Sequence, residues 1–223
     1  MHATSANLMT VLLKKYGVSG PLQVLDVGSG ISGKTTYPNG PFPPGMQQLT
    51  GHLCWILHPE WAYHGLDIEL APNVEIVAPD PYHWPVEDNS YDLVVSAQTM
   101  EHVPEVQLWM NEIFRVCKPE GIVIIIAPSA GAFHRCPVHC WCIMPDGMEY
   151  SMRCAGFDIL EVGFMAFGNP FNDCWGVAKK PTVPNTETQS EIYQKLRIKP
   201  LNEILGWSWD KYSDTNPVIN TRQ

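Results

Sequence analysis

Short apolar runs recur along the chain: LQVLDVG (22–28), AYHGLDIE (62–69), YDLVVSA (91–97) and GIVIIIAP (121–128). Runs without polar alternation are typical of strands that are buried on both faces, as in parallel sheets. Between the last two runs, residues 100–121 carry apolar side chains at helical spacing, and KPEG ends this pattern. Strand, helix and strand in this order predict a βαβ unit, and therefore an α/β fold with a right-handed crossover.

The segments between and after these runs have other patterns. TTYPNGPFPPG (35–45) is too rich in proline and glycine for a helix or a strand, so it predicts a loop, and residues 46–57 could then form a short helix. Residues 146–157 predict a short helix that ends at Gly156, and residues 158–168 and 173–180 predict two closing strands that we expect to be antiparallel.

The domain organisation follows from this order of elements. Residues 1–180 are predicted to form one domain. Residues 181–223 read as a C-terminal tail that packs on the domain or is partly mobile, with one short helix at EIYQKLRI (191–198).

Composition excludes several classes of protein. The chain has 223 residues, of which 45% are hydrophobic and 17% charged, an ordinary balance for a globular protein. Its net charge is −9 and its lysines and arginines are not clustered, so we expect no nucleic-acid partner. The N-terminus does not resemble a signal peptide, and the apolar run at 121–128 is too short to span a bilayer. A cytoplasmic protein without membrane contact, and with its seven cysteines as thiols, is the expectation; the oligomeric state is not indicated.

A glycine motif follows the first predicted strand. VLDVGSGISG places Asp26, Gly28 and Gly30 where a tight turn lets the backbone approach a ligand at the carboxyl end of a parallel sheet. Asp67 ends the second strand, where a carboxylate can accept hydrogen bonds from both hydroxyls of a ribose. Asp80 falls where a third strand should end, close to Tyr82 and Trp84, which could flank a purine. Either acid could instead be an ordinary turn residue, and this alternative is stronger for Asp80, because Asp-Pro is also a turn signal.

The order of the motifs is more specific than any one of them. DVGSG, GLDI, DPYHWPVEDNSYDLVVSAQTMEHV and EIFRVCKPEGIVIIIAPS follow one another over residues 20–180. This set resembles the class I S-adenosylmethionine (SAM)-dependent methyltransferases, and more narrowly the type 11 group associated with bacterial sugar and glycan pathways. The resemblance implies a Rossmann-like fold, with a mostly parallel seven-stranded sheet, a reversed last strand and helices on both faces.

The same resemblance implies SAM as the cofactor and assigns residues to it. The glycine turn would pack under the methionine part, Asp67 would bind the ribose, Asp80 and Tyr82 the adenine, and residues 96–98 the far side of the cofactor. Glu101 would bind the amino group or cap a helix. The implied cofactor residues are Asp26, Gly28, Ser29, Gly30, Asp67, Ile68, Asp80, Pro81, Tyr82, Ser96, Ala97, Gln98 and Glu101.

One departure from the family concerns the distance from Gly30 to Asp67, which is longer than the usual strand–helix–strand span. The extra loop takes the place of the usual helix after the glycine turn. This weighs against NAD, whose pyrophosphate requires a helix N-terminus directly after that turn. An NAD-dependent oxidoreductase nevertheless stays a rival hypothesis, as does a SAM-binding module without catalytic activity.

Methyl transfer from a sulfonium requires the acceptor to be held in line and, where the acceptor is a hydroxyl, to lose its proton. We expect a small polar acceptor, such as a sugar or glycan hydroxyl. The candidate bases are His102 after the fourth strand and His134 and His139 after the fifth. For His102, a structural hydrogen bond to a loop is an equal alternative. The sequence does not identify the acceptor or say whether O, N or S is methylated.

HRCPVHCWC (134–142) concentrates histidines and cysteines after the fifth strand. In sequences that this chain resembles, Tyr, Asp and Arg tend to stand at the positions of Cys136, His139 and Cys142. The rest of the stretch matches, which indicates an acceptor-facing loop with Arg135 and Trp141 as substrate-binding residues. The same three residues could also bind zinc, together with Cys154 or Cys174. Structural zinc sites usually use two ligand pairs, and no second pair is present, so no metal is predicted. A thiol nucleophile is not needed for this chemistry.

Overall fold

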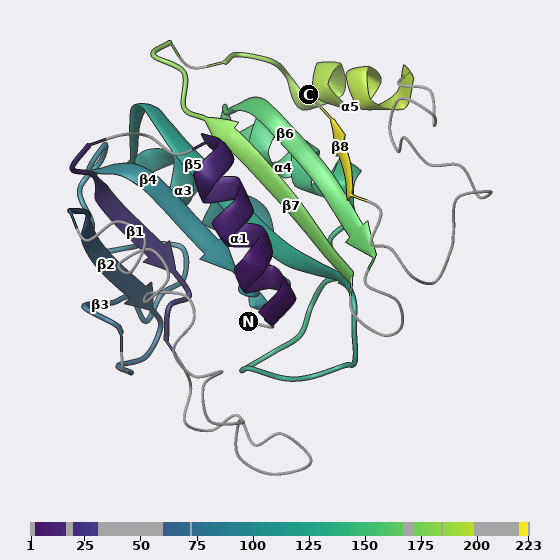
Figure 1. The fold of residues 1–223 in the computed structure, drawn as a ribbon. Coiled ribbons are helices and arrows are strands. Elements are labelled where there is room, and N and C mark those ends of the chain that lie inside the picture. The colour runs from purple at the N-terminus through teal and green to yellow at the C-terminus, as the bar shows by residue number, and fades with distance from the viewer. Residues whose placement is uncertain are drawn as a thin grey trace.

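A computed structural model describes seven parts of the chain: residues 3–16, 20–30, 60–71, 73–166, 172–183, 185–198 and 219–222. The loop expected at 35–45 and the helix expected at 46–57 lie outside these residues. Within them, one twisted sheet forms the centre of the fold, with helices on both of its faces (Figure 1).

Strands form at the four apolar runs and at the two predicted closing segments, and β3 and β8 are additional. Their bounds are β1 (Gln23–Val27), β2 (Ala62–Asp67), β3 (Ile76–Val77), β4 (Tyr91–Ala97), β5 (Cys117–Ala130), β6 (Asp158–Ala166), β7 (Asn172–Lys179) and β8 (Ile219–Arg222).

The order of the strands in the sheet is β3-β2-β1-β4-β5-β7-β6-β8. The first five strands of this order pair in parallel, whereas β7 runs antiparallel to both β5 and β6. This confirms the expected mostly parallel sheet with a reversed seventh strand. The outer strand β8 pairs antiparallel with β6 and was not predicted, because its sequence, INTR, is polar and short.

Helices cover both faces of the sheet. In Figure 1, α1 (Ala3–Tyr16) lies across one face of the sheet, over β5 and β7. The helices α3 (Val106–Val116) and α4 (Pro145–Ala155) lie behind the sheet. The first helix was not predicted, although the predicted helices around 100–121, 146–157 and 191–198 all form. Among the described residues, no helix is long and apolar enough to cross a membrane. The helices are α1 (Ala3–Tyr16), the 3₁₀ turn η1 (Met100–His102), α3 (Val106–Val116), α4 (Pro145–Ala155) and α5 (Gln189–Ile198).

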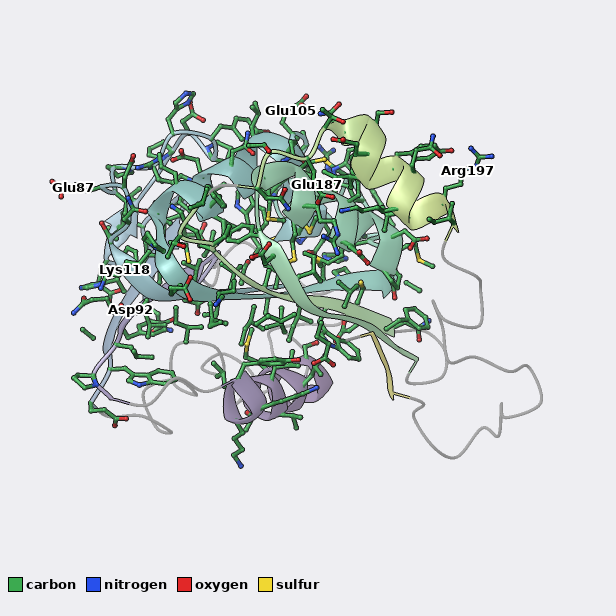
Figure 2. All side chains as sticks on the ribbon, turned by 90° about the horizontal axis from the view of Figure 1, so that it is seen from above. Glu87, Asp92, Glu105, Lys118, Glu187 and Arg197 are labelled. Atoms are coloured by element: carbon green, nitrogen blue, oxygen red, sulfur yellow. The ribbon has the colours of Figure 1, made fainter. Side chains whose placement is uncertain are left out.

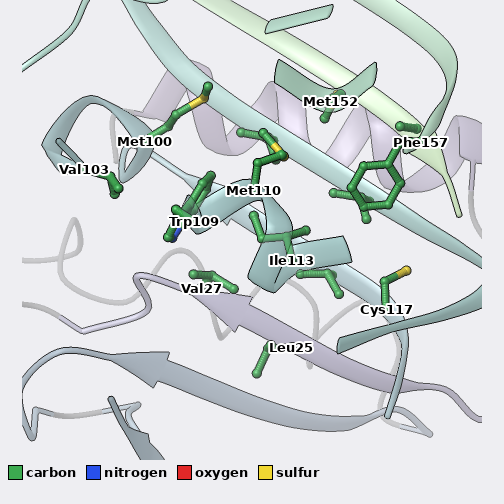
Figure 3. Close-up of a cluster of buried hydrophobic side chains, with 14 of the residues drawn as sticks. Leu25, Val27, Met100, Val103, Trp109, Met110, Ile113, Cys117, Met152 and Phe157 are labelled. Atoms are coloured by element: carbon green, nitrogen blue, oxygen red, sulfur yellow. The ribbon is translucent and has the colours of Figure 1, made fainter. Parts of the chain in front are cut away.

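The central strands separate two apolar layers because successive side chains point to opposite faces. In β1, Val24 contributes to the layer under α1, and Leu25 to the layer under α3 and α4. Ile124 and Ile125 divide in the same way in β5. Figure 3 shows the second layer, where Met110 and Ile113 of α3, Met152 of α4 and Phe157 belong to the same apolar cluster as Leu25 and Val27 of β1. Burial on both faces explains why these strands read as continuous apolar runs.

Polar groups fix the ends of the helices. Gly156 ends α4 in the left-handed conformation, with φ 104°, as the sequence predicts. Lys180 follows β7 and is 8% exposed. Its Nζ donates to the carbonyl oxygens of Phe114 and Cys117 at 2.7 and 2.9 Å, so a buried cation holds the C-terminal end of α3.

The described parts of the C-terminal segment contact the rest of the fold. Ile192 of α5 is buried, and α5 packs on α4, whereas β8 extends the sheet beside β6. Figure 2 shows α5 and α1 on opposite sides of the sheet. At the amino ends of the two central strands, Lys118 of β5 and Asp92 of β4 form an ion pair of 2.8 Å, and both are labelled in that view.

Candidate active site

The carboxyl ends of the parallel strands gather most of the residues that the sequence assigned to a site. β1 lies between β2 and β4, so the chain leaves β1 in one direction and returns to its other side at β4. Ligands of open α/β sheets bind at such a reversal of strand order. The residues after β1, β2 and β4 meet at this edge, and the segment between β5 and α4 leaves the sheet beside it (Figure 1).

The turn after β1 requires glycine at its first position. Gly28 has a φ of 79°, and an added Cβ would overlap the side chain of Thr99, with the Thr99 Cγ2 at 2.6 Å. The N–H groups of Gly28 and Ser29 donate to the carbonyl oxygen of Leu66 at 2.8 and 3.2 Å. The turn is thus hydrogen-bonded to β2 and packs closely against Thr99, two residues after the end of β4.

Asp67 stands where the sequence analysis placed the ribose-binding acid. Its Oδ2 accepts the N–H of Gly30 at 2.8 Å, and its Oδ1 accepts the N–H of Ile68 at 2.7 Å. Partial burial raises the pKa of Asp67, and these N–H groups oppose that effect. A carboxylate offers about four acceptor positions, so both oxygens can still accept hydrogen bonds from a ligand.

Asp26 is fully buried inside the sheet. Its carboxylate accepts a hydrogen bond from the hydroxyl of Tyr63 on β2, and burial raises its pKa to about 7. Negative charge on Asp67 and Glu75 acts in the same direction. Asp26 therefore joins β1 to β2 two residues before Gly28, and its side chain lies inside the sheet.

The residues after β4 connect three parts of the site. Ser96 donates to the carbonyl oxygen of Val27 at 2.8 Å and so joins β4 to the end of β1. Gln98, which has a φ of 59°, donates to Asp173 of β7 at 3.1 Å, and Asp173 also accepts the hydroxyl of Ser5 on α1. Ala97 is buried between these positions. The sequence analysis missed Thr99, Asp173 and Ser5 because isolated polar residues in different elements form no motif.

Asp80 and Tyr82 lie in a turn shortly after β3. The carboxylate of Asp80 accepts the N–H of Tyr82 at 2.8 Å and contacts His83 at 2.9 Å, and these contacts lower its pKa. Pro81 accepts the indole N–H of Trp84, which is 5% exposed and packs in the core. The expectation that Trp84 flanks a purine is therefore wrong, because its ring supports the turn from inside.

Glu101 is fully buried within η1, and neither of its carboxylate oxygens has a hydrogen-bond partner among the described residues. It does not cap a helix, since α3 begins five residues later at Val106. Burial raises its pKa to about 8, and the nearby Asp173 adds to this. The imidazole Nε2 of His102 lies 3.6 Å from Oε1 of Glu101.

The three candidate histidines form one cluster, although they come from separate segments. The ring centroid of His102 lies 5.0 Å from that of His134 and 5.8 Å from that of His139, and the last two are 4.5 Å apart. His102 Nδ1 contacts the carbonyl oxygen of Val138, so this nitrogen must carry the proton and leave Nε2 as an acceptor. The sequence analysis gave such a structural hydrogen bond as the alternative to a catalytic role for His102. The bond uses only Nδ1, so Nε2 can still accept a proton. Burial lowers the pKa of His102.

The loop from 131 to 144 is held against η1 by its backbone. The N–H groups of Cys140 and Trp141 donate to the carbonyl oxygen of Glu101 at 2.7 and 3.2 Å. The indole N–H of Trp141 donates to Val103 at 2.9 Å, while 46% of the residue stays exposed. Arg135 is exposed on the same loop. The structure thus places both predicted substrate residues on the segment that carries His134 and His139.

The sequence left open a zinc group of Cys136, His139 and Cys142, and these are not among the described side chains whose potential ligand atoms come together. Within the described residues, the side chains whose potential ligand atoms come together are Glu101, His102 and His134.

Comparison with known proteins identifies the fold. A family model described as "Methyltransferase domain" (Methyltransf_11) matches residues 59–125, which include β2, β4 and the candidate residues Asp67, Asp80 and Glu101. The described residues form one domain with the fold of the class I SAM-dependent methyltransferases, and the chain is similar in sequence to that family over residues 59–125. This domain has the antiparallel β7 between β5 and β6 that distinguishes it from dinucleotide-binding sheets, whose common strand order is 3-2-1-4-5-6.

The matches to curated relatives extend over only part of this chain and part of each relative. A chloroplastic tocopherol O-methyltransferase of Arabidopsis thaliana is 32% identical over 108 residues, which are 47% of this chain and 29% of that protein. Phosphoethanolamine N-methyltransferase 2 of Caenorhabditis elegans is 26% identical over 137 residues, which are 54% of this chain and 27% of that protein. The chain thus spans less than a third of these two relatives. The narrower resemblance to sugar-pathway enzymes stays a prediction.

Solved structures agree with the fold of the methyltransferase domain. A putative methyltransferase of Bacillus halodurans has a TM-score of 0.57 at 16% identity, over 78% of this chain and 99% of that chain. Phosphoethanolamine N-methyltransferase 2 of Haemonchus contortus, in complex with phosphomonomethylethanolamine and S-adenosylhomocysteine, has a TM-score of 0.55 at 17% identity, over 79% of this chain and 53% of that chain.

Proposed function

We propose that this protein transfers the methyl group of SAM to a hydroxyl oxygen of a small polar molecule. The observation that carries the proposal is the cluster of His102, His134 and His139 directly after the cofactor-side turns. Thr99, which closes the glycine turn, lies three residues before His102. The cofactor residues and the potential bases are therefore neighbours along the chain and in space.

The cofactor would bind across the carboxyl ends of β1, β2 and β4. Gly28 and Gly30 leave room for the methionine part, and the two oxygens of Asp67 would accept the ribose hydroxyls. The exposed turn at Asp80 and Tyr82 would contact the adenine. This assignment is supported by the hydrogen bonds that fix Asp67 and the glycine turn relative to each other. SAM carries no phosphate, so no helix N-terminus is required at the turn.

The methyl transfer itself would be an in-line displacement. An oxygen lone pair of the acceptor forms the new C–O bond, the C–S bond of the sulfonium breaks, and its electrons stay on sulfur to give the neutral thioether S-adenosylhomocysteine. The hydroxyl proton passes to the Nε2 of His102, whose Nδ1 donates to the carbonyl oxygen of Val138. His102 suits this role because burial lowers its pKa and keeps it neutral near pH 7.

The acceptor would lie against the 131–144 loop. Arg135 offers donors for a polar or anionic group, and Trp141 offers a partly exposed ring. Phe133, which is 76% exposed, stacks on the ring of His139 with 6° between their planes. Exposed rings beside polar groups are suited to a compact acceptor with an apolar face, and a sugar hydroxyl is one such acceptor.

The test is a methyl-transfer assay over a panel of hydroxyl, amine and thiol acceptors, with products identified by mass spectrometry. We expect a hydroxyl product, and a loss of about 100-fold or more in kcat for His102→Gln. His64→Gln, a change at a half-buried histidine of β2 outside the cluster, serves as the matched control and should keep its activity. Methylation of amines or thiols alone, or full activity in His102→Gln, would contradict the proposed chemistry. A protein that binds SAM but methylates nothing in the panel would support the non-catalytic alternative.

A further inference from the structure

Glu101 is the part of this site that the proposed function leaves unexplained. Its side chain is fully buried, and both carboxylate oxygens lack a hydrogen-bond partner among the described residues. A buried carboxylate without a partner is unfavourable, and such groups usually pair with a cation or bind a metal ion. The acidic neighbour Asp173 increases the need for positive charge at this position.

Two histidines lie close to this carboxylate, and each has one ring nitrogen against a backbone carbonyl oxygen. The Nδ1 of His102 faces the carbonyl oxygen of Val138, and the Nδ1 of His134 lies 3.0 Å from the carbonyl oxygen of Ala132. Because a carbonyl oxygen can only accept, each Nδ1 carries the proton and each Nε2 is an acceptor. Histidines that bind metals nearly always donate their second nitrogen in this way, which fixes the tautomer and the orientation of the ring.

The three side chains already converge. One potential ligand atom of Glu101, of His102 and of His134 lies within 4.8 Å of the other two, and Nε2 of His102 is 3.6 Å from Oε1 of Glu101. Ligands that surround an ion at about 2.0–2.2 Å lie roughly 3–4 Å from one another, so small side-chain movements would complete the arrangement.

We propose that Glu101, His102 and His134 bind a divalent transition-metal ion. Two imidazoles and one carboxylate are a ligand set for Zn²⁺, Fe²⁺, Mn²⁺ and Co²⁺, and they leave coordination positions open. Exposure increases from the buried Glu101 through the partly buried His102 to the exposed His134, so the open positions face the 131–144 loop.

The ion would act on the acceptor side of the methyl-transfer reaction, and this part of the inference rests on the proposed function. An acceptor hydroxyl bound to the ion loses its proton to solvent water more readily, because the metal stabilises the oxygen anion that attacks the methyl group. With the ion bound, the two Nε2 atoms are ligands, and the metal replaces an imidazole as the activating group. Metal binding itself requires neither SAM nor turnover.

The test begins with protein that has been stripped by a chelator and is then titrated with Co²⁺, with binding followed by visible absorption. We expect one ion per chain and no thiolate-to-metal charge-transfer band, because the ligands are nitrogen and oxygen. Glu101→Gln and His134→Gln should each weaken Co²⁺ binding at least tenfold. His134 is exposed, so its variant should fold normally even if Glu101→Gln does not, and thermal unfolding checks both.

Matched controls separate this site from other ligands. His83→Gln removes an exposed histidine, and Cys142→Ser removes an exposed thiol of the same loop; both should leave Co²⁺ binding unchanged. A charge-transfer band that disappears in Cys142→Ser, or equal affinity in His134→Gln and the native protein, would overturn the proposal. Calorimetry with S-adenosylhomocysteine on the same samples keeps the two ideas apart. Cofactor binding without Co²⁺ binding rejects only the metal site, whereas Co²⁺ binding without cofactor binding rejects the proposed function.

Discussion

Replacement of Asp67 by Asn tests the cofactor side of the site. Each carboxylate oxygen holds one backbone N–H, from Gly30 at 2.8 Å and Ile68 at 2.7 Å, and each keeps acceptor capacity for one ribose hydroxyl. Asn retains one acceptor oxygen and loses the charge, so at least one charge-assisted hydrogen bond disappears. Such a bond contributes about 1.5–3 kcal/mol, which corresponds to a roughly 10- to 100-fold weaker affinity for SAM.

The assay is isothermal titration calorimetry with S-adenosylhomocysteine and with its 2′-deoxy analogue. The native protein should discriminate against the deoxy analogue, and Asp67→Asn should lose most of that discrimination. This double comparison isolates the ribose contact from any general loosening of the turn. Glu69→Gln, two residues away and exposed, is the control and should bind both ligands like the native protein. Equal discrimination in Asp67→Asn and the native protein would refute the ribose role.

Three further predictions concern stability. Gly28→Ala should destabilise the fold by about 1–3 kcal/mol, because the residue has a positive φ and its Cβ would overlap Thr99; partial rescue by Thr99→Ala in thermal unfolding checks the overlap. Asp26 contacts Tyr63, and burial raises the pKa of Asp26 from 3.8 to about 7. The folded state therefore favours the protonated form, so the free energy of unfolding should fall by up to about 4 kcal/mol as pH rises from 4 to 7. Urea unfolding across this range should show a flatter profile for Asp26→Asn, and an unchanged profile would contradict the assignment. Lys180→Met should cost about 2–4 kcal/mol in urea unfolding, since it leaves buried carbonyl oxygens at the end of α3 without donors; a cost below about 0.5 kcal/mol would contradict the capping role.

Much of the fold could be predicted because burial on both faces leaves a simple pattern. The apolar runs that became β1, β4 and β5 contain few polar residues for this reason, and Gly156 marks the end of α4 because its φ is positive. The helix α1 left a pattern as well: Leu8, Leu12 and Leu13 are buried at helical spacing. The pairing of β8 with β6 leaves no pattern, because a polar edge strand is defined by its partner.

The candidate site was predicted only in part. The motif after β1 and the acid after β2 could be read because they are local, and His102, His134 and His139 could each be named as a base. Their convergence on Glu101 could not be predicted, because backbone hydrogen bonds from the 131–144 loop to the Glu101 carbonyl bring them together. The link from Gln98 through Asp173 to Ser5 likewise depends on contacts between distant elements.

The central claim is that the carboxyl ends of β1, β2 and β4 bind SAM. Isothermal titration calorimetry of the native protein with SAM and with S-adenosylhomocysteine tests it most directly. One molecule should bind per chain, each ligand should displace the other, and NAD should not compete. The absence of binding by either ligand to the folded protein, or displacement by NAD, would contradict it.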